Sequence, residues 1–291
     1  MVRRTNRWSC LTTRGNNVAA GLLAAWLLTL PAPAWAGNAE ADTRPLAAFE
    51  ISPPRRQPVL GERLAFQGRW LGLPVGSGWI EVKEIVELEG HRAYHIEAQA
   101  SSNDLLSVFY PIHDTVHSYL DADTLQPLRF EKDQQEGTYR AREVVVFDAP
   151  QRRATYHSLV NNSTKTIELP EQFQDLISAL YWFRSQPLDA VDQLRVNLYT
   201  DEKIYQTRII IRPPLHLELL KRGTFPCLVA EPEASFKGLL VRRGRIWAYL
   251  TTDTYRLPLL VRATTPWGQM SAVLDASSIP PDIIRLAQSL E

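Results

Sequence analysis

The sequence predicts a mainly β fold, an antiparallel curved sheet or half-open barrel with one or two short helices. Short apolar runs that are rich in β-branched and aromatic residues recur along the chain from residue 59 onward. Turn residues separate these runs at the intervals of a β-meander. Two segments have the spacing of apolar residues that a helix requires.

The strand predictions begin after a polar, Pro-rich stretch. Arg63 to Trp70 alternates, with Leu64 and Phe66 on one face, and Gly78 to Val86 follows a turn predicted at Leu71 to Gly76. The other predicted strands are 93–100, 116–120, 128–132, 142–147, 154–160, 194–199, 207–211, 227–231, 239–242, 246–250, 259–263 and 270–274. Together they are enough for one large β domain.

The helix predictions rest on end signals. Asp175 has the chemistry of an N-cap for a helix at 176–185, which Pro187 ends. A second helix is predicted to begin near Pro281, because proline suits the first turn. A shorter helical turn is predicted within 101–106.

Two hairpins have similar sequences. Residues 119–128 and 249–259 each contain Tyr-Leu, then an Asp-Thr turn, then Pro-Leu at the start of the return strand. The Asp and Thr oxygens suit that turn because they bond nearby backbone N–H groups. Two interpretations stay open: an internal echo, or two ordinary hairpins.

The first 36 residues have the layout of a secretory signal peptide. Four arginines, with no acidic residue among them, precede an uncharged apolar run at 18–30. Ala34-Trp35-Ala36 then stands directly before Gly37, as at a cleavage site. The apolar run is shorter than the ~20 residues of a membrane span. We therefore expect a signal peptide at 1–36, a flexible lead-in at 37–58, a β-rich domain at 59–278 and a C-terminal helix at 279–291.

Removal of this signal peptide would change the net charge and the cysteine content of the chain. The chain has 32 Lys+Arg and 32 Asp+Glu, and removal of the four signal-peptide arginines leaves 28 against 32, a net charge of about −4. A mildly acidic domain does not suit nucleic acid. Cys10 precedes the apolar run, so it is not a lipoprotein cysteine, and Cys227 is predicted to be a buried, inert thiol.

One histidine pair has the spacing of a zinc-protease motif. His113 and His117 lie four apart, but that motif needs a helix to bring both imidazoles to one metal. The residues between them favour a strand, in which positions four apart are about 13 Å apart along the chain. No metal site is predicted.

The acidic residues that were considered as a catalytic pair lie at predicted turns or helix starts, where local hydrogen bonds account for Asp. They are Asp121, Asp123, Asp148, Asp175 and Asp253. The sequence has no nucleophile elbow, phosphate loop or C-x-x-C motif. No catalytic residue and no cofactor are predicted, and the protein is not expected to be an enzyme.

Two groups of residues are candidates for binding. Arg242, Arg243 and Arg245 form a basic hairpin tip that either contacts an anionic partner or is simply solvated. Aromatic side chains either line a ligand cavity in the half-barrel or belong to its core. The candidates for such a lining are Trp70, Trp79, Tyr110, Tyr181, Trp182 and Trp247.

Several short stretches, in order along the chain, carry a family resemblance. They include Gly61-Glu62-Arg63-Leu64, 70–76, 175–181 and Leu257-Pro258. With these stretches the chain resembles the exported bacterial domain-of-unknown-function family numbered 3108, a resemblance that implies no activity and no catalytic residues. The hairpins are also similar to those of periplasmic lipoprotein-carrier proteins, which are half-open antiparallel barrels around an apolar cavity.

The functional expectation is a periplasmic protein that is not a lipoprotein and that binds an apolar or amphipathic envelope component without a cofactor. The alternative is a structural or assembly factor that docks onto an envelope protein complex, and a hydrolase is third. An open apolar cavity on the concave side favours the first, and a packed interior with an exposed patch favours the second.

Overall fold

The computed structural model describes residues 56–188, 191–219, 222–234, 245–265 and 268–288. These residues form one antiparallel sheet of fourteen strands, in the order β8-β7-β6-β5-β4-β3-β2-β1-β14-β13-β12-β11-β10-β9. The predicted fold class is therefore confirmed. The strands are β1 (Arg63–Trp70), β2 (Leu73–Leu88), β3 (His91–Ser102), β4 (His113–Asp121), β5 (Pro127–Glu136), β6 (Tyr139–Asp148), β7 (Arg153–Ser158), β8 (Thr164–Glu168), β9 (Gln193–Thr200), β10 (Lys203–Leu219), β11 (Gly223–Ala234), β12 (Ile246–Thr251), β13 (Pro258–Thr265) and β14 (Gly268–Leu274).

The helical elements are short. They are α1 (Asp104–Ser107), α2 (Leu176–Ser185), the 3-10 turn η3 (Ala276–Ser278) and α4 (Pro281–Gln288). The helices predicted at 176–185 and from Pro281 are confirmed, and the short turn is α1. Within the described residues, no helix has the length and apolar character needed to cross a membrane.

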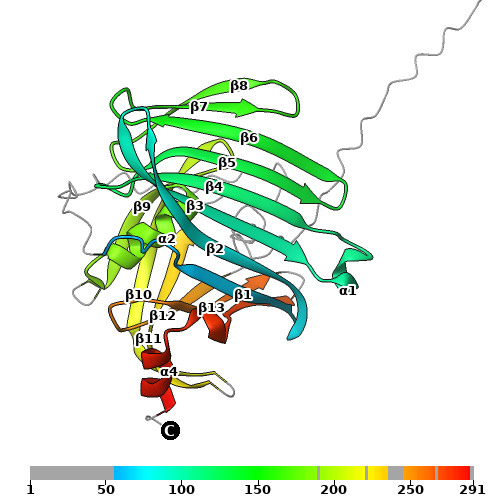
Figure 1. Ribbon diagram of the computed structural model, residues 1–291, viewed down its shortest axis with the longest axis vertical. Helices are drawn as coiled ribbons and strands as arrows, with labels where there is room; N and C mark the ends of the chain where they lie inside the picture. The colour runs from blue at the N-terminus through cyan, green and yellow to red at the C-terminus, as the bar shows by residue number, and fades with distance from the viewer. Residues whose placement is uncertain (1–55, 189–190, 220–221, 235–244, 266–267, 289–291) are drawn as a thin grey trace, which may run out of the picture.

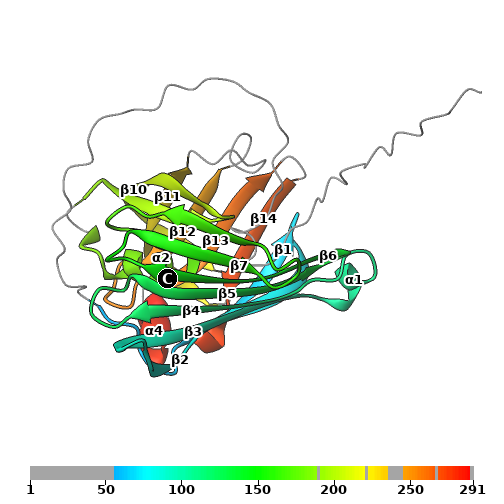
Figure 2. The ribbon, with the colours of Figure 1, turned by 90° about the horizontal axis from the view of Figure 1, so that it is seen from above.

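The sheet curls around α2, as Figures 1 and 2 show. Ile177 and Tyr181 of α2 pack with side chains from β2 to β7. Phe183, on the same helix, packs with Leu194 of β9 and Leu228 of β11. Because α2 contacts both halves of the sheet, it lies inside the curl. We call the face toward α2 the inner face and the opposite one the outer face.

The two edges of the sheet approach each other without pairing. Lys165 of β8 forms an ion pair with Glu202, in the turn between β9 and β10. Phe147 of β6 meets Tyr199 of β9 edge to face, with ring centroids 5.2 Å apart. Among the described strands, β8 and β9 are not hydrogen-bonded to each other. The molecule is therefore a half-open barrel, closed at this seam by side chains.

Bulges allow this curvature, because an extra residue bends and twists its strand. The register shifts at Gly68/Arg69, Val82/Glu84, Tyr119/Leu120, Arg212/Leu215 and Tyr249/Leu250. Two of the five shifts fall at the Tyr-Leu pairs of the two similar hairpins. The turns themselves are bonded differently, since Asp121 accepts from the Thr124 N–H in the first hairpin and Asp253 accepts from the Arg256 N–H in the second, at positions two residues apart in the aligned sequences. The two hairpins therefore share the position of the bulge but not the hydrogen bonds of the turn.

Two segments differ from the sequence prediction, and three others lie wholly or mostly outside the described residues. β2 begins at Leu73, so the predicted six-residue turn shrinks to Leu71 and Gly72, which both have positive φ. β8 was not predicted, because its residues are polar and exposed. The strand predicted at 239–242, the signal peptide and nearly all of the lead-in lie outside the described residues.

Candidate functional site

The inner face is divided into an apolar part and a polar part. Around α2 it is packed, since Phe173 and Tyr181 are buried among side chains of the surrounding strands. Along β5 the inner face changes from Phe130 to Lys132, Gln134 and Glu136, all of which are buried. The concave side is thus filled where it is apolar, and it becomes polar toward the end of the sheet that lies away from α2.

Lys132 has its own partner in this polar row. Its Nζ lies 3.1 Å from Oε1 of Glu143, which is opposite it on β6. Burial works to lower the pKa of Lys132, but Glu143 and Asp201 outweigh it and raise that pKa above its ordinary value. This part of the row is therefore an internally satisfied ammonium–carboxylate pair.

Two carboxyl groups face each other further along the row. Asp114 of β4 accepts a hydrogen bond at Oδ1 from the Gln135 backbone N–H, 2.9 Å away. Gln134 Nε2 donates to Glu136 Oε1, also at 2.9 Å. Burial and then the neighbouring Glu136 raise the pKa of Asp114 well above its ordinary value. The two carboxyl groups can bond each other only when one carries a proton.

The immediate surroundings of this pair are small or aromatic. Ala100 of β3 lies beside Asp114, and Ala141 of β6 lies beside Gln134. On the turn side, the Tyr110 ring is so close that a Cβ on Gly137 would lie 2.8 Å from it. Burial, with Glu136 and Asp114, raises the pKa of the Tyr110 hydroxyl to about 12. The pair therefore has an aromatic neighbour and little side-chain bulk beside it.

Replacing Asp114 with Asn should make the protein less sensitive to alkaline pH. An acid whose pKa is raised in the folded state holds its proton there after the unfolded chain has lost it, so stability falls as pH rises above about 4. Glu136, Lys132 and Tyr110 are the titratable groups that face it. Urea denaturation at pH 5, 7 and 9 should show a smaller fall for D114N than for the wild type. Equal falls would contradict the shared proton.

The same end of the sheet carries most of the exposed apolar side chains. Because the strands are antiparallel and mostly sequential, the turns after β1, β3, β5 and β7 meet at one rim, on the right of Figure 1. Nine of the twelve exposed large hydrophobic residues in the described part of the chain lie there. We call this set the apolar rim: Trp70, Leu71, Leu73, Leu105, Val108, Phe109, Tyr139, Leu159 and Val160.

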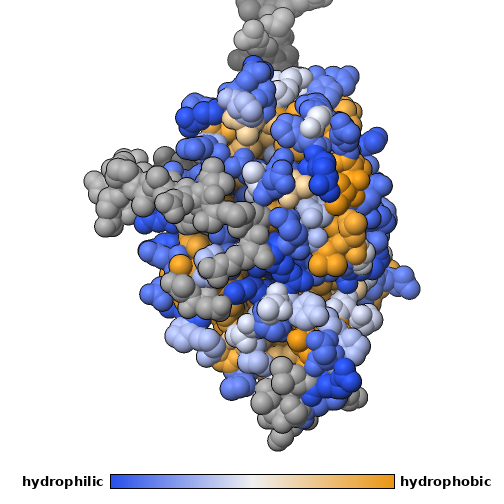
Figure 3. Space-filling view, turned by 60° about the vertical axis from the view of Figure 1, so that its left-hand side comes forward, coloured by the Kyte–Doolittle hydropathy of each residue, from blue (hydrophilic) through white to orange (hydrophobic). Residues whose placement is uncertain are grey.

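The opposite rim, on the side of α2, is mainly polar. Its turns contain Glu89-Gly90, 121–126 and 149–152, where carboxylate side chains bond to the backbone. Figure 3 brings this side of the molecule forward and shows mainly hydrophilic residues, with hydrophobic ones gathered along one margin. Exposed apolar clusters on a soluble domain mark interaction sites. Because most exposed large hydrophobic residues of the described chain lie on the apolar rim, that rim is the candidate interaction site.

The structure separates the predicted aromatic lining. Trp79 and Trp247 lie on the outer face, since their neighbours Ile80 and Ala248 face the clusters around α2. The side chains of Arg63 and Arg245 lie over their rings. These two tryptophans therefore do not line the interior.

The other four predicted aromatic residues fall into two groups. Tyr181 is buried core, and Trp182 packs partly buried against the cluster around Phe183. Trp70 belongs to the apolar rim, and Tyr110 borders the polar row just below it. The six predicted residues thus do not form one surface, but the last two lie at the same end of the sheet.

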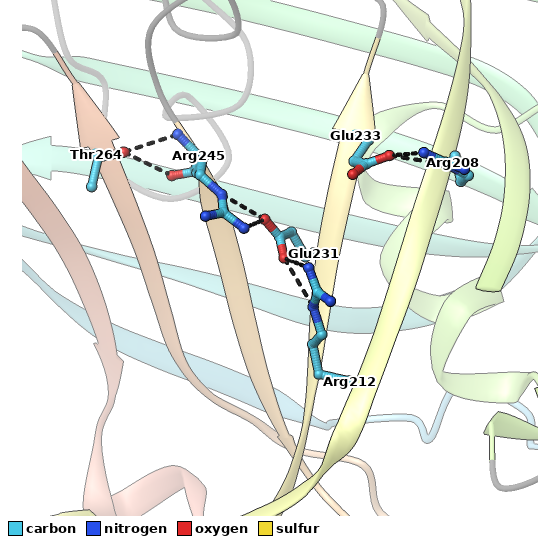
Figure 4. A network of polar contacts seen from close by, with 6 residues as sticks. All are labelled: Arg208, Arg212, Glu231, Glu233, Arg245 and Thr264. Atoms are coloured by element: carbon cyan, nitrogen blue, oxygen red, sulfur yellow. Dashed lines mark hydrogen bonds and ion pairs between the residues drawn. The ribbon is translucent and has the colours of Figure 1, made fainter. Parts of the chain in front are cut away.

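Of the three arginines predicted to contact an anion, only Arg245 lies within the described residues. Arg242 and Arg243 lie outside the described residues. Arg245 donates from Nε to Glu231 Oε1 at 2.7 Å, and Arg212 binds the other oxygen of the same carboxylate (Figure 4). The guanidinium of Arg245 is therefore already paired with Glu231 on the outer face.

The remaining candidates behave as structural residues. His113 and His117 lie on the strand β4, as predicted, and His117 Nδ1 is 3.0 Å from Nε2 of His95. Cys227 is fully buried, and burial raises its thiol pKa to about 12, consistent with an inert thiol. Asp175 caps α2. Sequence reasoning missed the Asp114–Glu136 pair, although the run of polar residues on both faces of 131–136 is a signal for it.

Comparison with known proteins agrees with this fold. A family model described as a protein of unknown function, DUF3108, matches residues 65–275. Among solved structures, the chain is similar to a β-barrel-like protein of the domain of unknown function DUF1849 from Brucella abortus. That match has a TM-score of 0.51 and 9% sequence identity, and covers 75% of this chain and 97% of that chain. At this identity the likeness concerns the fold alone. No curated protein matches.

Proposed function

The chain belongs to the DUF3108 family of proteins of unknown function, and we propose that it binds an amphipathic component of the cell envelope without covalent chemistry. Within the described residues the concave side is filled around α2 instead of forming the expected open cavity, so the apolar rim, and not an interior cavity, carries this proposal. Side chains such as Phe109, which is 81% exposed, would contact the apolar part of the ligand. The polar row just inside the rim would receive its polar part.

The proposal places the protein in the periplasm as a non-enzymatic binder. The cationic start, the short apolar run and the Ala34-Trp35-Ala36 pattern support export with cleavage before Gly37. Cys10 precedes the apolar run, which argues against a lipid anchor. The mildly acidic mature chain argues that an apolar contact, rather than general charge attraction, drives binding.

Removing apolar side chains from the rim should abolish amphiphile binding and leave the fold intact. In the triple variant L73S/L105S/F109S, all three replaced side chains are more than half exposed, so little core packing is lost. We expect binding of a fluorescent fatty-acyl probe to weaken by about tenfold or more, because each buried CH₂ contributes ~0.8 kcal/mol. Probe titration and a thermal melt measure the two properties.

The matched control is Leu215→Ser. Leu215 is a 40% exposed leucine in β10, away from the rim. This variant should bind the probe like the wild type. Equal probe binding by the triple variant, or an equal loss in L215S, would refute binding at the rim.

Docking onto an envelope protein is the second candidate function. The packing of α2 inside the sheet favours it, since a filled interior leaves the rim as the available apolar surface. A photo-crosslinking residue at position 109 distinguishes the two in cells. Adducts with lipid support amphiphile binding, whereas one defined protein adduct supports docking.

A further inference from the structure

We propose that the apolar rim inserts into the surface of a phospholipid bilayer, so that the amphipathic partner of this protein is the membrane itself and not a single lipid molecule. This inference rests on the proposed function and names its partner. Three features of the rim favour a bilayer: the spread of its apolar side chains over separate turns, the fixed outward placement of the turn at α1, and the cations beside its aromatic residues.

The apolar side chains of the rim come from four separate turns. Leu71, Phe109, Tyr139 and Val160 lie in or beside the turns after β1, β3, β5 and β7, which Figure 1 shows along one side of the molecule. From β1 to β7 the sheet has six steps between neighbouring strands, which is about 29 Å along the sheet at ~4.8 Å a step. A row of this length suits an extended surface better than one lipid molecule.

The turn at α1 has its apolar face toward water. Leu105, Val108 and Phe109 have the spacing of one helical face, and all three are more than half exposed. Leu106, which lies between them in the sequence, packs inward against the sheet. A surface helix of a soluble domain has its apolar face toward the core, so this turn is arranged in the opposite way.

Polar bonds hold the turn at α1 in this orientation. Asn103 accepts at Oδ1 from the Leu106 backbone N–H at 3.0 Å and donates from Nδ2 to the Pro74 carbonyl at 2.8 Å. At the other end of the loop, Ser102 Oγ accepts from the Ile112 backbone N–H at 2.9 Å. Exposure of apolar side chains to water costs free energy, so side chains that are fixed in water indicate a partner that covers them.

Aromatic and cationic side chains lie beside the apolar tips in the order that a bilayer presents its layers. Trp70 and Tyr139, which are 39% and 37% exposed, project less than Phe109. Tryptophan and tyrosine favour the level of the lipid headgroups. Arg69 directly precedes Trp70, and Arg140 directly follows Tyr139. Two aromatic residues of the rim thus each have a cation next to them in the sequence.

Both arginines are exposed and bind neutral groups, so their charge is available to lipid phosphate. Arg69 donates from Nε and Nη2 to Oε1 of Gln67, at 3.2 and 2.9 Å. Arg140 donates from Nη1 to the carbonyls of Gly137 and Tyr139, at 2.9 and 2.7 Å. Guanidinium groups suit phosphate oxygens, and this charge complementarity favours a phospholipid surface over an uncharged apolar partner.

Vesicle flotation tests this inference with vesicles of phosphatidylcholine and phosphatidylglycerol in equal amounts. The wild-type protein should float with them, and L73S/L105S/F109S should bind them about tenfold or more weakly, because its apolar contact is lost. R69Q/R140Q should also bind about tenfold or more weakly, since each arginine near an anionic surface adds to the attraction. D104N, which removes an exposed carboxylate of the turn at α1, should bind more tightly.

The matched control for the arginines is Arg153→Gln. Arg153 is exposed on the opposite rim and donates to the side chain of Gln151 at 2.8 Å, much as Arg69 donates to Gln67. R153Q removes the same charge from the chain as R69Q does. It should float like the wild type, and a loss equal to that of R69Q would show that total charge, and not the rim, governs binding.

A fluorophore on an introduced cysteine locates the contact. F109C places it on the rim, and L215C places it on an exposed position of β10 away from the rim. Cys227 is fully buried, so the dye reacts with the introduced thiol. With vesicles, the dye at 109 should shift to shorter wavelength and be quenched by lipids brominated in their acyl chains. The dye at 215 should do neither.

The outcomes distinguish this inference from the proposed function. Binding of the fatty-acyl probe without flotation, or flotation without quenching at 109, overturns bilayer insertion and leaves amphiphile binding intact. Lipid recovered with the protein away from the vesicles shows that single molecules are extracted, and it also overturns insertion. Failure to bind both the probe and the vesicles overturns both proposals. If the triple variant does not fold, the comparison of positions 109 and 215 decides.

Discussion

Replacing Arg184 with Met should destabilise the protein by about 2–4 kcal/mol, because it removes two charge-assisted hydrogen bonds to Glu62 and leaves that largely buried carboxylate with Arg56 as its remaining ion-pair partner. The Arg184 side chain is 2% exposed. Its two terminal nitrogens bind the two oxygens of Glu62 at 2.8 and 2.7 Å, and one also donates to the Tyr255 carbonyl at 3.1 Å. These bonds tie the end of α2 to the start of β1 and to the β12–β13 turn.

The matched comparison is the exposed pair of Arg208 and Glu233. Arg208 is 49% exposed, and ion pairs of this kind contribute about 0–1 kcal/mol. Urea denaturation of R184M and R208M measures both free energies of unfolding. A cost for R184M as small as that for R208M would contradict the role of the buried pair. Removing both charges, in R184M/E62M, should recover part of the loss.

Much of the fold follows from local sequence signals. Alternation identified most strands, and Asp175 with Pro187 gave the bounds of α2, because capping and chain termination are local chemistry. β8 was missed because Thr164 to Glu168 is a polar, exposed edge that buries too little to leave an apolar pattern. The start of β2 was misplaced because a two-residue turn leaves Leu73 and Pro74 in the strand.

The candidate site was harder to predict from the sequence than the fold, for a physical reason. Residues 131–136 are polar on both faces, so alternation gives no indication of which face is buried, and the predicted strand ended at Lys132. Trp79 is a large aromatic residue and was placed inside, yet it lies on the outer face beneath the Arg63 side chain. Which face of a strand points inward depends on pairing across the whole curled sheet, and that information is not local.

Replacing Asp175 with Ala should destabilise the protein by about 2–4 kcal/mol, the combined effect of a lost helix cap and a lost bond to a buried hydroxyl. Asp175 Oδ1 accepts from the backbone N–H groups of Ile177 and Ser178 at 2.8 and 2.7 Å. Oδ2 accepts from the Ser118 hydroxyl of β4 at 2.6 Å. One carboxylate therefore both begins α2 and holds the helix against the inner face of the sheet.

Asp275 supplies the control, because it caps η3 through Ser277 in a similar way but at the surface. D275A should cost no more than about 1 kcal/mol. Burial raises the pKa of Asp175, against the bonds from Ser118 and the helix N–H groups, so a neutral amide should be tolerated better than a methyl group. D175N should therefore lie between the wild type and D175A in urea denaturation. If D175A instead unfolds at the same urea concentration as D275A, α2 is held in the curl by its apolar contacts alone.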